Sequence, residues 1–358
     1  MTTEEKIKLI KEVGEEIVTE KELKALLDSN EKLIAYDGFE PSGQMHIAQG
    51  ILRAINVNKM TKAGVKFKML VADWHALANK KMGGDLDNIQ TVGKYFIEIW
   101  RSCGMDMENV EFIWASDLVK DADYWKLVLQ IAGTNSINRF IRTAEIMGRG
   151  EKDELTAAQL IYPCMQAADI FTLGAKITQL GMDQRKVNVL AREIGNQLGF
   201  WKPVIVSHHM LAGLLKPSAE TTDKVKRTIE LKMSKSNPDS AIFMTDTKDD
   251  IERKLNKAWC PEGMTEENPV LEYVRYILFE VFDKFTVERN ERFGGDITFD
   301  SYEDLEKAYK KKEIHPQDLK TSVTNKLNEI LTPVREHFQK NPYAKNLLAQ
   351  VQSFQVTR

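Results

Sequence analysis

Short apolar segments alternate with longer helical segments through much of the chain, and this alternation limits the possible folds more than any other feature. The apolar segments of the first third span residues 33–36, 67–73 and 110–115. Between them, residues 46–63 and 86–103 have apolar side chains at helical spacing. Strands and helices that alternate in this way predict a parallel sheet built from β–α–β units. Such sheets bind ligands beyond the carboxyl ends of their strands, where Tyr36, Asp37 and Asp73 lie.

The rest of the chain extends this pattern and then departs from it. Residues 3–28 are expected to be helical, and further strands are expected near residues 177–180 and 204–207. Residues 117–153 are helical in pattern and rich in arginine and asparagine, which indicates an insertion between the two halves of the sheet. From about residue 246 the pattern is mostly helical. At 358 residues the chain is too long for one ordinary core, so we expect two domains.

Composition and charge exclude several classes of protein. No run approaches the roughly 18 apolar residues of a membrane helix, and residues 1–20 lack the character of a signal or transit peptide. Cys103, Cys164 and Cys260 are widely separated, so neither a disulfide framework nor a zinc site is indicated, and a reducing cytoplasm is the expected compartment. The net charge of −3 provides no general attraction for nucleic acid, so any RNA contact is expected from local patches.

The first predicted strand ends in a turn rich in glycine and proline. The turn is DGFEPSG at residues 37–43, and the sequence HIAQ follows at residues 46–49. Glycine lets the backbone approach a ligand closely, and a helix that begins near His46 would offer free N–H groups to phosphate. The turn matches neither the GxGxxG dinucleotide fingerprint nor the GxxxxGK(S/T) P-loop. The alternative is an ordinary connection between a strand and a helix.

A predicted helix at residues 154–171 carries polar side chains on one face of an otherwise apolar segment. Tyr162, Gln166 and Asp169 lie at positions i, i+4 and i+7, which places them on the same side of the helix. A helix that is apolar most of the way round is usually buried. These side chains therefore either bond one another or face a polar ligand, and a buried aspartate favours the ligand. Pro163 interrupts one helical hydrogen bond, so a helix that begins there is a second possibility.

Two charged loops complete the set of motifs. Residues 181–186, GMDQRK, follow a predicted strand and suit a substrate-binding loop, whereas a solvated helix start is the alternative. Residues 232–236, KMSKS, place Lys232 and Lys235 in a short basic loop that can close over polyphosphate. Lysine suits this task because it is a compact charge on a flexible stem. A surface loop rich in lysine and serine is the alternative there.

In this order, the motifs resemble those of class I aminoacyl-tRNA synthetases, and most of all the tyrosyl-tRNA synthetases of archaea and the eukaryotic cytosol. Besides KMSKS, the similar segments are AYDGFEPSG (35–43), VADWHA (71–76), LIYPCMQAADIF (160–171) and LGMDQRK (180–186). The resemblance covers nearly the whole chain. It implies an α/β fold, with a Rossmann-like parallel-sheet catalytic domain that carries a helical insertion, followed by a mostly α-helical anticodon-binding domain.

The domain boundaries follow from the positions of these motifs. We expect the catalytic domain at residues 1–230, with its insertion at about residues 117–153. The KMSKS loop and a linker are expected at residues 231–245, and the anticodon-binding domain at residues 246–358.

The resemblance also implies a tyrosine-binding site. Tyr36 and Asp169 match the pair that bonds the phenol of the substrate, whereas Tyr162, Gln166 and Gln184 match residues that hold its α-amino group and ring. The indole of tryptophan offers only a lone N–H donor, so Tyr36 and Asp169 disfavour tryptophanyl-tRNA synthetase as the alternative. A non-catalytic RNA-binding paralogue is a second alternative, which the intact set of site residues disfavours.

For ATP, the resemblance implies residues of the glycine turn and of the KMSKS loop. They are Gly38, Glu40, His46, Gln49, Lys232, Met233, Ser234, Lys235 and Ser236. His46 matches the first histidine of the HIGH signature, but Gln49 stands where that signature has its second histidine. An amide donates a hydrogen bond without adding charge, so Gln49 is the weaker of the predicted catalytic residues His46, Gln49, Lys232 and Lys235. Mg²⁺ is expected to arrive with ATP, and no tightly bound metal or organic cofactor is expected.

The implied reaction activates tyrosine with ATP, releases pyrophosphate and passes the tyrosyl group to tRNA-Tyr. Phe293 and Asp318 match residues that read the anticodon, Phe293 by stacking on a base and Asp318 by accepting a hydrogen bond from its edge. The insertion matches the region that forms the homodimer interface in this family. The expected partners are therefore tRNA-Tyr, L-tyrosine, ATP and a second copy of the chain, in the cytoplasm, without contact to membrane or DNA.

Overall fold

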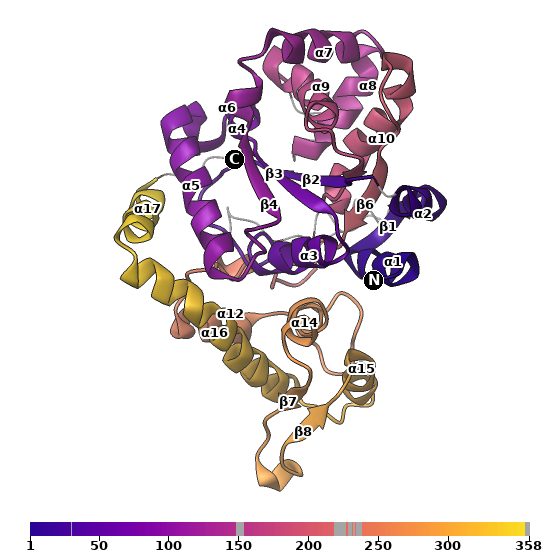
Figure 1. Cartoon of the computed structure of the whole chain (residues 1–358). Helices are drawn as coiled ribbons and strands as arrows, with labels where there is room; N and C mark the ends of the chain where they lie inside the picture. The colour runs from indigo at the N-terminus through magenta and orange to yellow at the C-terminus, as the bar shows by residue number, and fades with distance from the viewer. Residues whose placement is uncertain are drawn as a thin grey trace.

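A mixed six-stranded sheet lies at the centre of the larger part of the molecule (Figure 1). The computed structural model describes residues 1–29, 31–147, 154–217, 227, 231, 233 and 238–354. Within those residues the sheet has the order β1–β6–β5–β2–β3–β4. Its strands are β1 (Gly14–Val18), β2 (Ile34–Phe39), β3 (Lys66–Val71), β4 (Val110–Trp114), β5 (Ile177–Thr178) and β6 (Val204–His208). Strands β2 to β6 pair in parallel, as the alternation of strands and helices predicts.

The edge strand β1 contradicts the expectation that residues 3–28 are helical throughout. Helices α1 (Thr3–Val13) and α2 (Glu20–Asp28) form, but the segment between them pairs antiparallel with β6. Arg185 reinforces this edge by an ion pair with Glu16, at 2.7 Å between Nε and Oε2. The segment GEEIV has no alternating apolar pattern, and its partner strand lies far along the chain. Only the tertiary contact with β6 makes it a strand.

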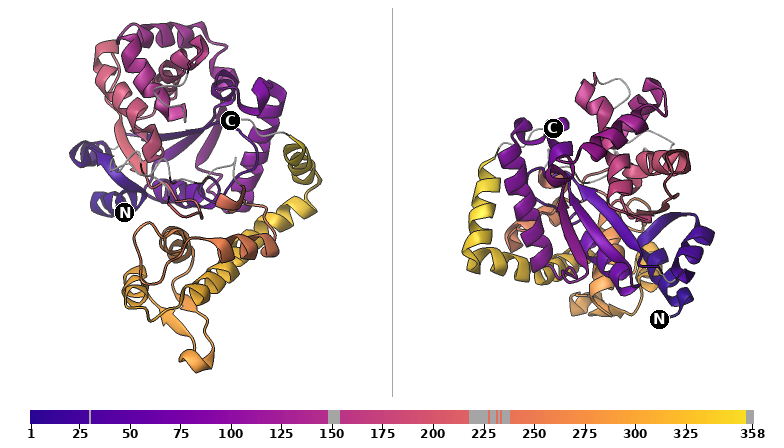
Figure 2. Two further views of the ribbon diagram at one scale, coloured as in Figure 1. Left: turned by 180° about the vertical axis from the view of Figure 1, so that it is seen from behind. Right: turned by 45° about the horizontal axis from the view of Figure 1, so that its top comes forward.

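Helices cover both faces of the sheet, as the two views in Figure 2 show. One face packs against α1, α3 and α5, and the other against α7, α9 and α10. These helices span α3 (Ile51–Lys62), α5 (Leu86–Ser102), α7 (Ala122–Ala132), α9 (Ala157–Thr172) and α10 (Arg185–Ile194). Successive residues of a strand point to opposite faces, so Ala35 enters the first core and Tyr36 the second.

The segment predicted as an insertion is helical and lies over α9 (Figure 1). It contains α6 (Ala115–Leu118), α7, α8 (Ile137–Thr143) and the 3-10 turn η2 (Ala144–Met147), and residues 148–153 lie outside the described part of the chain. Helices α7 and α8 both pack against α9. The insertion therefore covers the helix that carries Tyr162, Gln166 and Asp169.

Helix α9 begins before its proline rather than at it. The Thr156 hydroxyl oxygen accepts a hydrogen bond from the backbone N–H of Gln159, and Oε1 of Gln159 accepts one from the backbone N–H of Thr156. This capping box satisfies N–H groups of the first turn, so the helix starts at Ala157. Pro163 then lies inside the helix, where it is buried.

The C-terminal part is mostly helical, as expected, and adds one two-stranded hairpin. Its elements are α12 (Lys248–Lys257), α13 (Pro269–Tyr273), the π-helix η6 (Val274–Leu278), α14 (Phe279–Val281), β7 (Phe285–Val287), the 3-10 turn η7 (Glu291–Phe293), β8 (Ile297–Phe299), α15 (Tyr302–Lys310), α16 (Pro316–Lys340) and α17 (Pro342–Ser353). Helix α16 packs on α12, and α17 returns to pack on α5 beside the sheet (Figure 1). The domain boundaries near residues 230 and 246 stay predictions.

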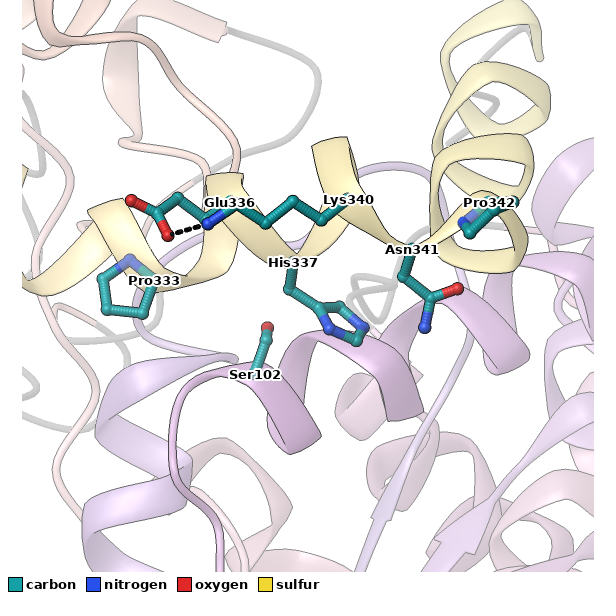
Figure 3. A pocket seen from close by; sticks show the side chains of 7 residues that line it. All are labelled: Ser102, Pro333, Glu336, His337, Lys340, Asn341 and Pro342. Atoms are coloured by element: carbon teal, nitrogen blue, oxygen red, sulfur yellow. Dashed lines mark hydrogen bonds and ion pairs between the residues drawn. The ribbon is translucent and has the colours of Figure 1, made fainter.

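The junction of the two parts contains a cavity that is separate from the predicted site. His337 of α16 lies 2.7 Å from Glu98 of α5, between Nε2 and Oε2. Beside this pair is a cavity of about 660 Å³, lined by Ser102, Pro333, Glu336, His337, Lys340, Asn341 and Pro342 (Figure 3). None of the residues predicted to bind tyrosine or ATP lines it, so it belongs to the junction. Among the described residues, every helix is too short or too polar to span a bilayer.

Candidate active site

The predicted tyrosine-binding residues meet near the carboxyl end of β2. Tyr36 lies in β2 and is 1% exposed. Helix α9 carries Tyr162, Gln166 and Asp169. Gln184 is the last residue of the short helix η3 (Met182–Gln184). Helix α9 covers the face of the sheet that Tyr36 enters. The packing of this helix on the sheet therefore brings together residues that are far apart in the sequence.

The Asp169 carboxylate is the centre of this cluster and is completely buried. Tyr124 of α7 donates its hydroxyl to Oδ1 at 2.9 Å, and Nε2 of His75, in α4 (Asp73–Ala78), lies 2.9 Å from Oδ2. Burial alone would lower the pKa of His75, but the neighbouring Asp169 carboxylate, together with Glu40 and Asp73, outweighs burial and raises that pKa. Burial, together with the same carboxylate, raises the pKa of Tyr36, so the Tyr36 hydroxyl keeps its proton.

Gln166 and Gln184 form the side of the cluster that faces η2. Gln166 Nε2 donates to Gln184 Oε1 at 3.1 Å, and Gln184 Nε2 donates to the carbonyl oxygen of Ile146 at 3.0 Å. Within the described part of the chain, Gln166 Oε1 is buried without a hydrogen-bond partner. The polar face of α9 is thus partly satisfied by its neighbours and keeps an acceptor for a ligand, so both interpretations of that face apply.

Tyr162 connects the cluster to the glycine turn. Its ring packs edge-on against the His75 ring, with centroids 5.2 Å apart. Burial and the adjacent Glu40 carboxylate raise the pKa of Tyr162 well above its usual value. Glu40 in turn accepts from Nδ2 of Asn79 at 3.1 Å. A ligand at this end of β2 would therefore meet a neutral phenol and a carboxylate.

Gly38 lies in β2 directly beside Tyr36, and the chain there leaves no room for a side chain. A Cβ atom at Gly38 would lie 2.9 Å from the Tyr36 hydroxyl oxygen. The glycine therefore keeps the space in front of that hydroxyl open, which is the close approach that the turn sequence indicates.

The HIAQ segment does not begin a helix at His46, contrary to expectation. His46 forms an antiparallel bridge with Phe243, and on either side of it Ile47 N donates to Ile242 O and Met244 N to Met45 O, both at 2.9 Å. Residues 47–50 form a turn, and α3 begins only at Ile51. The long-range pairing extends the backbone at His46, so the expected helix N-terminus is not present there.

Gln49 and Gly50 fix this turn against the core. The backbone oxygen of Gln49 accepts from the indole Nε1 of Trp100 at 2.9 Å. A Cβ atom at Gly50 would lie 2.3 Å from Sδ of Met244, so glycine is needed where the two segments cross. Residues 242–244, which follow the KMSKS loop in the sequence, are thereby held against the HIAQ turn.

Most of the KMSKS loop lies outside the described residues. Those positions are Lys232, Ser234, Lys235 and Ser236. Met233 is described, and its side chain is 5% exposed in the larger hydrophobic core. Beside it, Leu231 O accepts from Gly213 N at 2.7 Å. The assignment of this loop to ATP stays a prediction, and Met233 itself is a core residue.

Asp37 and Asp73, both predicted at strand ends, have partners within the protein. Asp37 lies inside β2, contrary to expectation, because the pairing of β2 with β3 continues to Phe39. Asp37 is paired with Arg53 of α3, and burial, which Arg53 opposes, raises the pKa of Asp37 to about 6. Asp73 accepts from the backbone N–H groups of Trp74 and Ser116 and from the Gln90 side chain, at 2.9–3.0 Å. Asp73 therefore anchors the start of α4, and with it His75, instead of facing a ligand.

Comparison with known proteins places the chain in a family. The model of the family described as "tRNA synthetases class I (W and Y)" matches residues 28–332, which is most of the chain and includes every element around Asp169. The chain belongs to this family.

Named relatives align with this synthetase over nearly its full length. It is 52% identical to "Tyrosine--tRNA ligase 1, cytoplasmic" of Arabidopsis thaliana, over 99% of this chain and 90% of that protein. It is 40% identical to the tyrosine–tRNA ligase of Saccharolobus islandicus, over 100% of both chains. A solved structure of tyrosyl-tRNA synthetase from Pyrococcus horikoshii, complexed with L-tyrosine, matches with a TM-score of 0.91 at 37% identity, over 98% of this chain and 100% of that one. The resemblance and the fold class are confirmed.

The residues predicted to read the anticodon lie in the C-terminal part of this synthetase. Phe293 ends η7 at the tip of the β7–β8 hairpin and is 71% exposed, while Asp318 lies in the first turn of α16. Ser322 joins the two elements, since its hydroxyl accepts from Glu288 N at 2.9 Å and donates to Asp318 O at 3.0 Å. An exposed phenylalanine at a hairpin tip is available for stacking on a base.

Sequence reasoning missed two side chains of the cluster, His75 and Tyr124. His75 stands in the VADWHA segment, where a histidine within buried apolar residues could have indicated a polar partner. Tyr124 lies in the insertion, and no local pattern links it to Asp169. Both become visible only because α4 and α7 pack beside α9.

Proposed function

We propose that this chain is a tyrosine–tRNA ligase, which activates L-tyrosine with ATP and then transfers the tyrosyl group to tRNA-Tyr. The observation that carries the proposal is the buried Asp169 carboxylate of α9, which interacts electrostatically with Tyr36 of β2. The names of the relatives at 40–52% identity support the same assignment.

The two groups suit the phenol of tyrosine. A phenol hydroxyl donates one hydrogen bond and accepts others, so it can donate to Asp169 while it accepts from Tyr36. The indole of tryptophan can only donate, and phenylalanine can do neither. Gln166 and Gln184, with the free acceptor Gln166 Oε1, would take the α-amino group, and Tyr162 would pack on the substrate.

The activation step needs no general base. The carboxylate of tyrosine attacks the α-phosphorus of ATP, whose bond to the pyrophosphate oxygen breaks, so the products are tyrosyl-adenylate and pyrophosphate. The protein contributes orientation of the two substrates and stabilisation of charge on the phosphates. Gly38, Glu40, His46 and Gln49 would approach ATP from the glycine turn, and Lys232 and Lys235 from the KMSKS loop, with Mg²⁺ carried by ATP.

ATP–pyrophosphate exchange with single amino acids tests this proposal. Exchange is expected with tyrosine and not with tryptophan or phenylalanine at comparable concentrations. Exchange with tryptophan alone would assign the chain to the tryptophan branch of the family. The absence of exchange with any amino acid would make it a non-catalytic paralogue.

The C-terminal hairpin is assigned to the anticodon of tRNA-Tyr. Phe293→Ala is expected to lower kcat/KM for tRNA in aminoacylation by about 10- to 100-fold, because stacking of a base on an aromatic ring contributes about 1–3 kcal/mol. Tyrosine-dependent pyrophosphate exchange should not change. Tyr343→Ala removes another exposed aromatic ring, 52% exposed on α17, and serves as the matched control. Equal losses in both assays would show a folding defect instead of a role in tRNA binding.

The insertion is assigned to a homodimer interface. Leu129, Ile137 and Ile161 expose apolar side chains on α7, α8 and α9, with Leu129 and Ile137 69% and 68% exposed. Ile137→Asp is expected to weaken the dimer by at least about 100-fold, since it places a charge in an apolar contact. Sedimentation velocity measures the change, and Val281→Asp, at an exposed apolar position outside the insertion, is the control. A wild-type monomer would refute this assignment.

The compartment follows the named relatives. The Arabidopsis relative bears "cytoplasmic" in its name, and we assign this chain to the cytoplasm as well.

A further inference from the structure

We propose that Tyr124 and His75 are specificity-determining positioning residues, which hold the Asp169 carboxylate so that it selects a substrate side chain bearing a hydroxyl group. This inference rests on the proposed tyrosine–tRNA ligase function. It concerns two residues outside the predicted tyrosine-binding set.

The first reason is that Asp169 is a buried carboxylate with two partners from two other helices. Asp169 is 0% exposed, and its neighbours on α9, Ala168 and Ile170, are also fully buried. A carboxylate in such surroundings needs bonded or charged partners to remain ionised. The Tyr124 hydroxyl donates to Oδ1, and His75 Nε2 lies close to Oδ2, each at 2.9 Å. Oδ1 is therefore held by a hydrogen bond from α7, while His75 of α4 faces Oδ2 as its ion-pair partner.

The second reason is that both partners are themselves held in place. Tyr124 is 2% exposed, and its hydroxyl also lies 3.4 Å from the backbone oxygen of Met165, one turn before Asp169. The His75 ring packs edge-on against Tyr162, and α4 is anchored by the three hydrogen bonds that Asp73 accepts. Partners that cannot move restrict rotation of the carboxylate, which is how a supporting shell orients a binding group.

The third reason is that the two partners leave acceptor capacity unused. A carboxylate offers about four lone-pair sites, so the bond from Tyr124 and the contact with His75 leave room for a further donor. Tyr36 of β2 lies in the same core as α9, so the further donor would lie between Asp169 and Tyr36. A substrate hydroxyl would thus meet a charged acceptor whose direction is already set.

The experiment compares one ligand that has the hydroxyl with one that lacks it. In Tyr124→Phe, the KM for tyrosine in pyrophosphate exchange is expected to rise about tenfold, the ratio that corresponds to about 1.4 kcal/mol. The inhibition constant of phenylalanine against the same reaction should not change, because phenylalanine makes no bond to Asp169. Tyr95→Phe makes the same chemical change at a buried tyrosine in the other core and should alter neither constant.

Two further variants separate positioning from packing. His75→Gln keeps a side-chain donor and should retain more tyrosine affinity than His75→Leu, which removes it. In an Asp169→Asn background, Tyr124→Phe should add little to the tyrosine KM, because a residue that acts through Asp169 has no separate effect.

The outcomes are distinguishable. If Tyr124→Phe weakens tyrosine and phenylalanine equally, or changes neither, the inference is overturned while the ligase function stands. If the wild-type protein does not activate tyrosine at all, the proposed function itself fails.

Discussion

Replacing Lys235 by alanine is expected to slow tyrosyl-adenylate formation about 100-fold or more while leaving the affinity for tyrosine nearly unchanged. The reason is that a cation which neutralises the β- and γ-phosphates contributes most when charge builds up on the leaving pyrophosphate. Two features of the described residues, one within the loop and one after it, support this expectation. Met233 is anchored in the core, and residues 242–244 pair with the HIAQ turn, which carries the other predicted ATP contacts.

Steady-state pyrophosphate exchange measures the rate, and equilibrium dialysis with tyrosine measures the affinity. Lys120→Ala, at an exposed lysine paired with Asp117, is the control for loss of a surface charge. A Lys235 variant that loses rate and tyrosine affinity in equal proportion would show that the lysine binds the ground state, and the transition-state role would be wrong.

Breaking the Arg53–Asp37 pair is expected to destabilise the fold by about 3–5 kcal/mol, because it leaves a buried carboxylate without a counter-charge. Asp37 is 1% exposed, and the Arg53 side chain is 12% exposed. The variant is Arg53→Met, which keeps most of the apolar stem. Denaturant unfolding measures the loss of unfolding free energy. The control is Arg253→Met, which removes an arginine from a surface ion pair with Asp239 and is expected to lower the unfolding free energy by at most about 1 kcal/mol.

The loss should depend on pH in a defined direction. Burial raises the pKa of Asp37 to about 6 in the folded protein, above its ordinary value of 3.8. The folded state therefore binds this proton more readily than the unfolded chain, and stability falls as pH rises from about 4 to about 6. Without Arg53 the pKa of Asp37 moves still higher. The difference in unfolding free energy between Arg53→Met and the wild type should therefore be largest above pH 6 and should shrink toward pH 4. Arg53→Met combined with Asp37→Asn should recover much of the loss; a deficit independent of both pH and Asp37 would contradict this account.

Motifs with local spacing were predicted well. Tyr162, Gln166 and Asp169 share one face of α9 because three residues and four residues are the spacings of a helical turn. The strand that carries Tyr36 was predicted as well, but it continues to Phe39 instead of ending at Tyr36, because residues 37–39 also pair with β3. The family assignment followed from the order of these motifs along the chain.

The errors have a common physical cause. Residues 14–18 are a strand because β6 pairs with them, and His46 has an extended backbone because it bridges to Phe243. Neither partner is near in the sequence, so no local pattern could indicate either pairing. The same holds for Tyr124 and His75, whose relation to Asp169 depends on the way α4 and α7 pack beside α9.

The amino-acid sequence by itself thus determined the fold class and the family, and through the family resemblance it predicted the five residues expected to bind tyrosine. These properties depend on periodicity and on short motifs, which are local. Tertiary structure alone decided which groups satisfy the buried polar side chains: Arg53 for Asp37, backbone N–H groups for Asp73, and Tyr124 with His75 for Asp169. A buried charge takes its partner from whichever element lies beside it in space, and only the packed fold determines that neighbour.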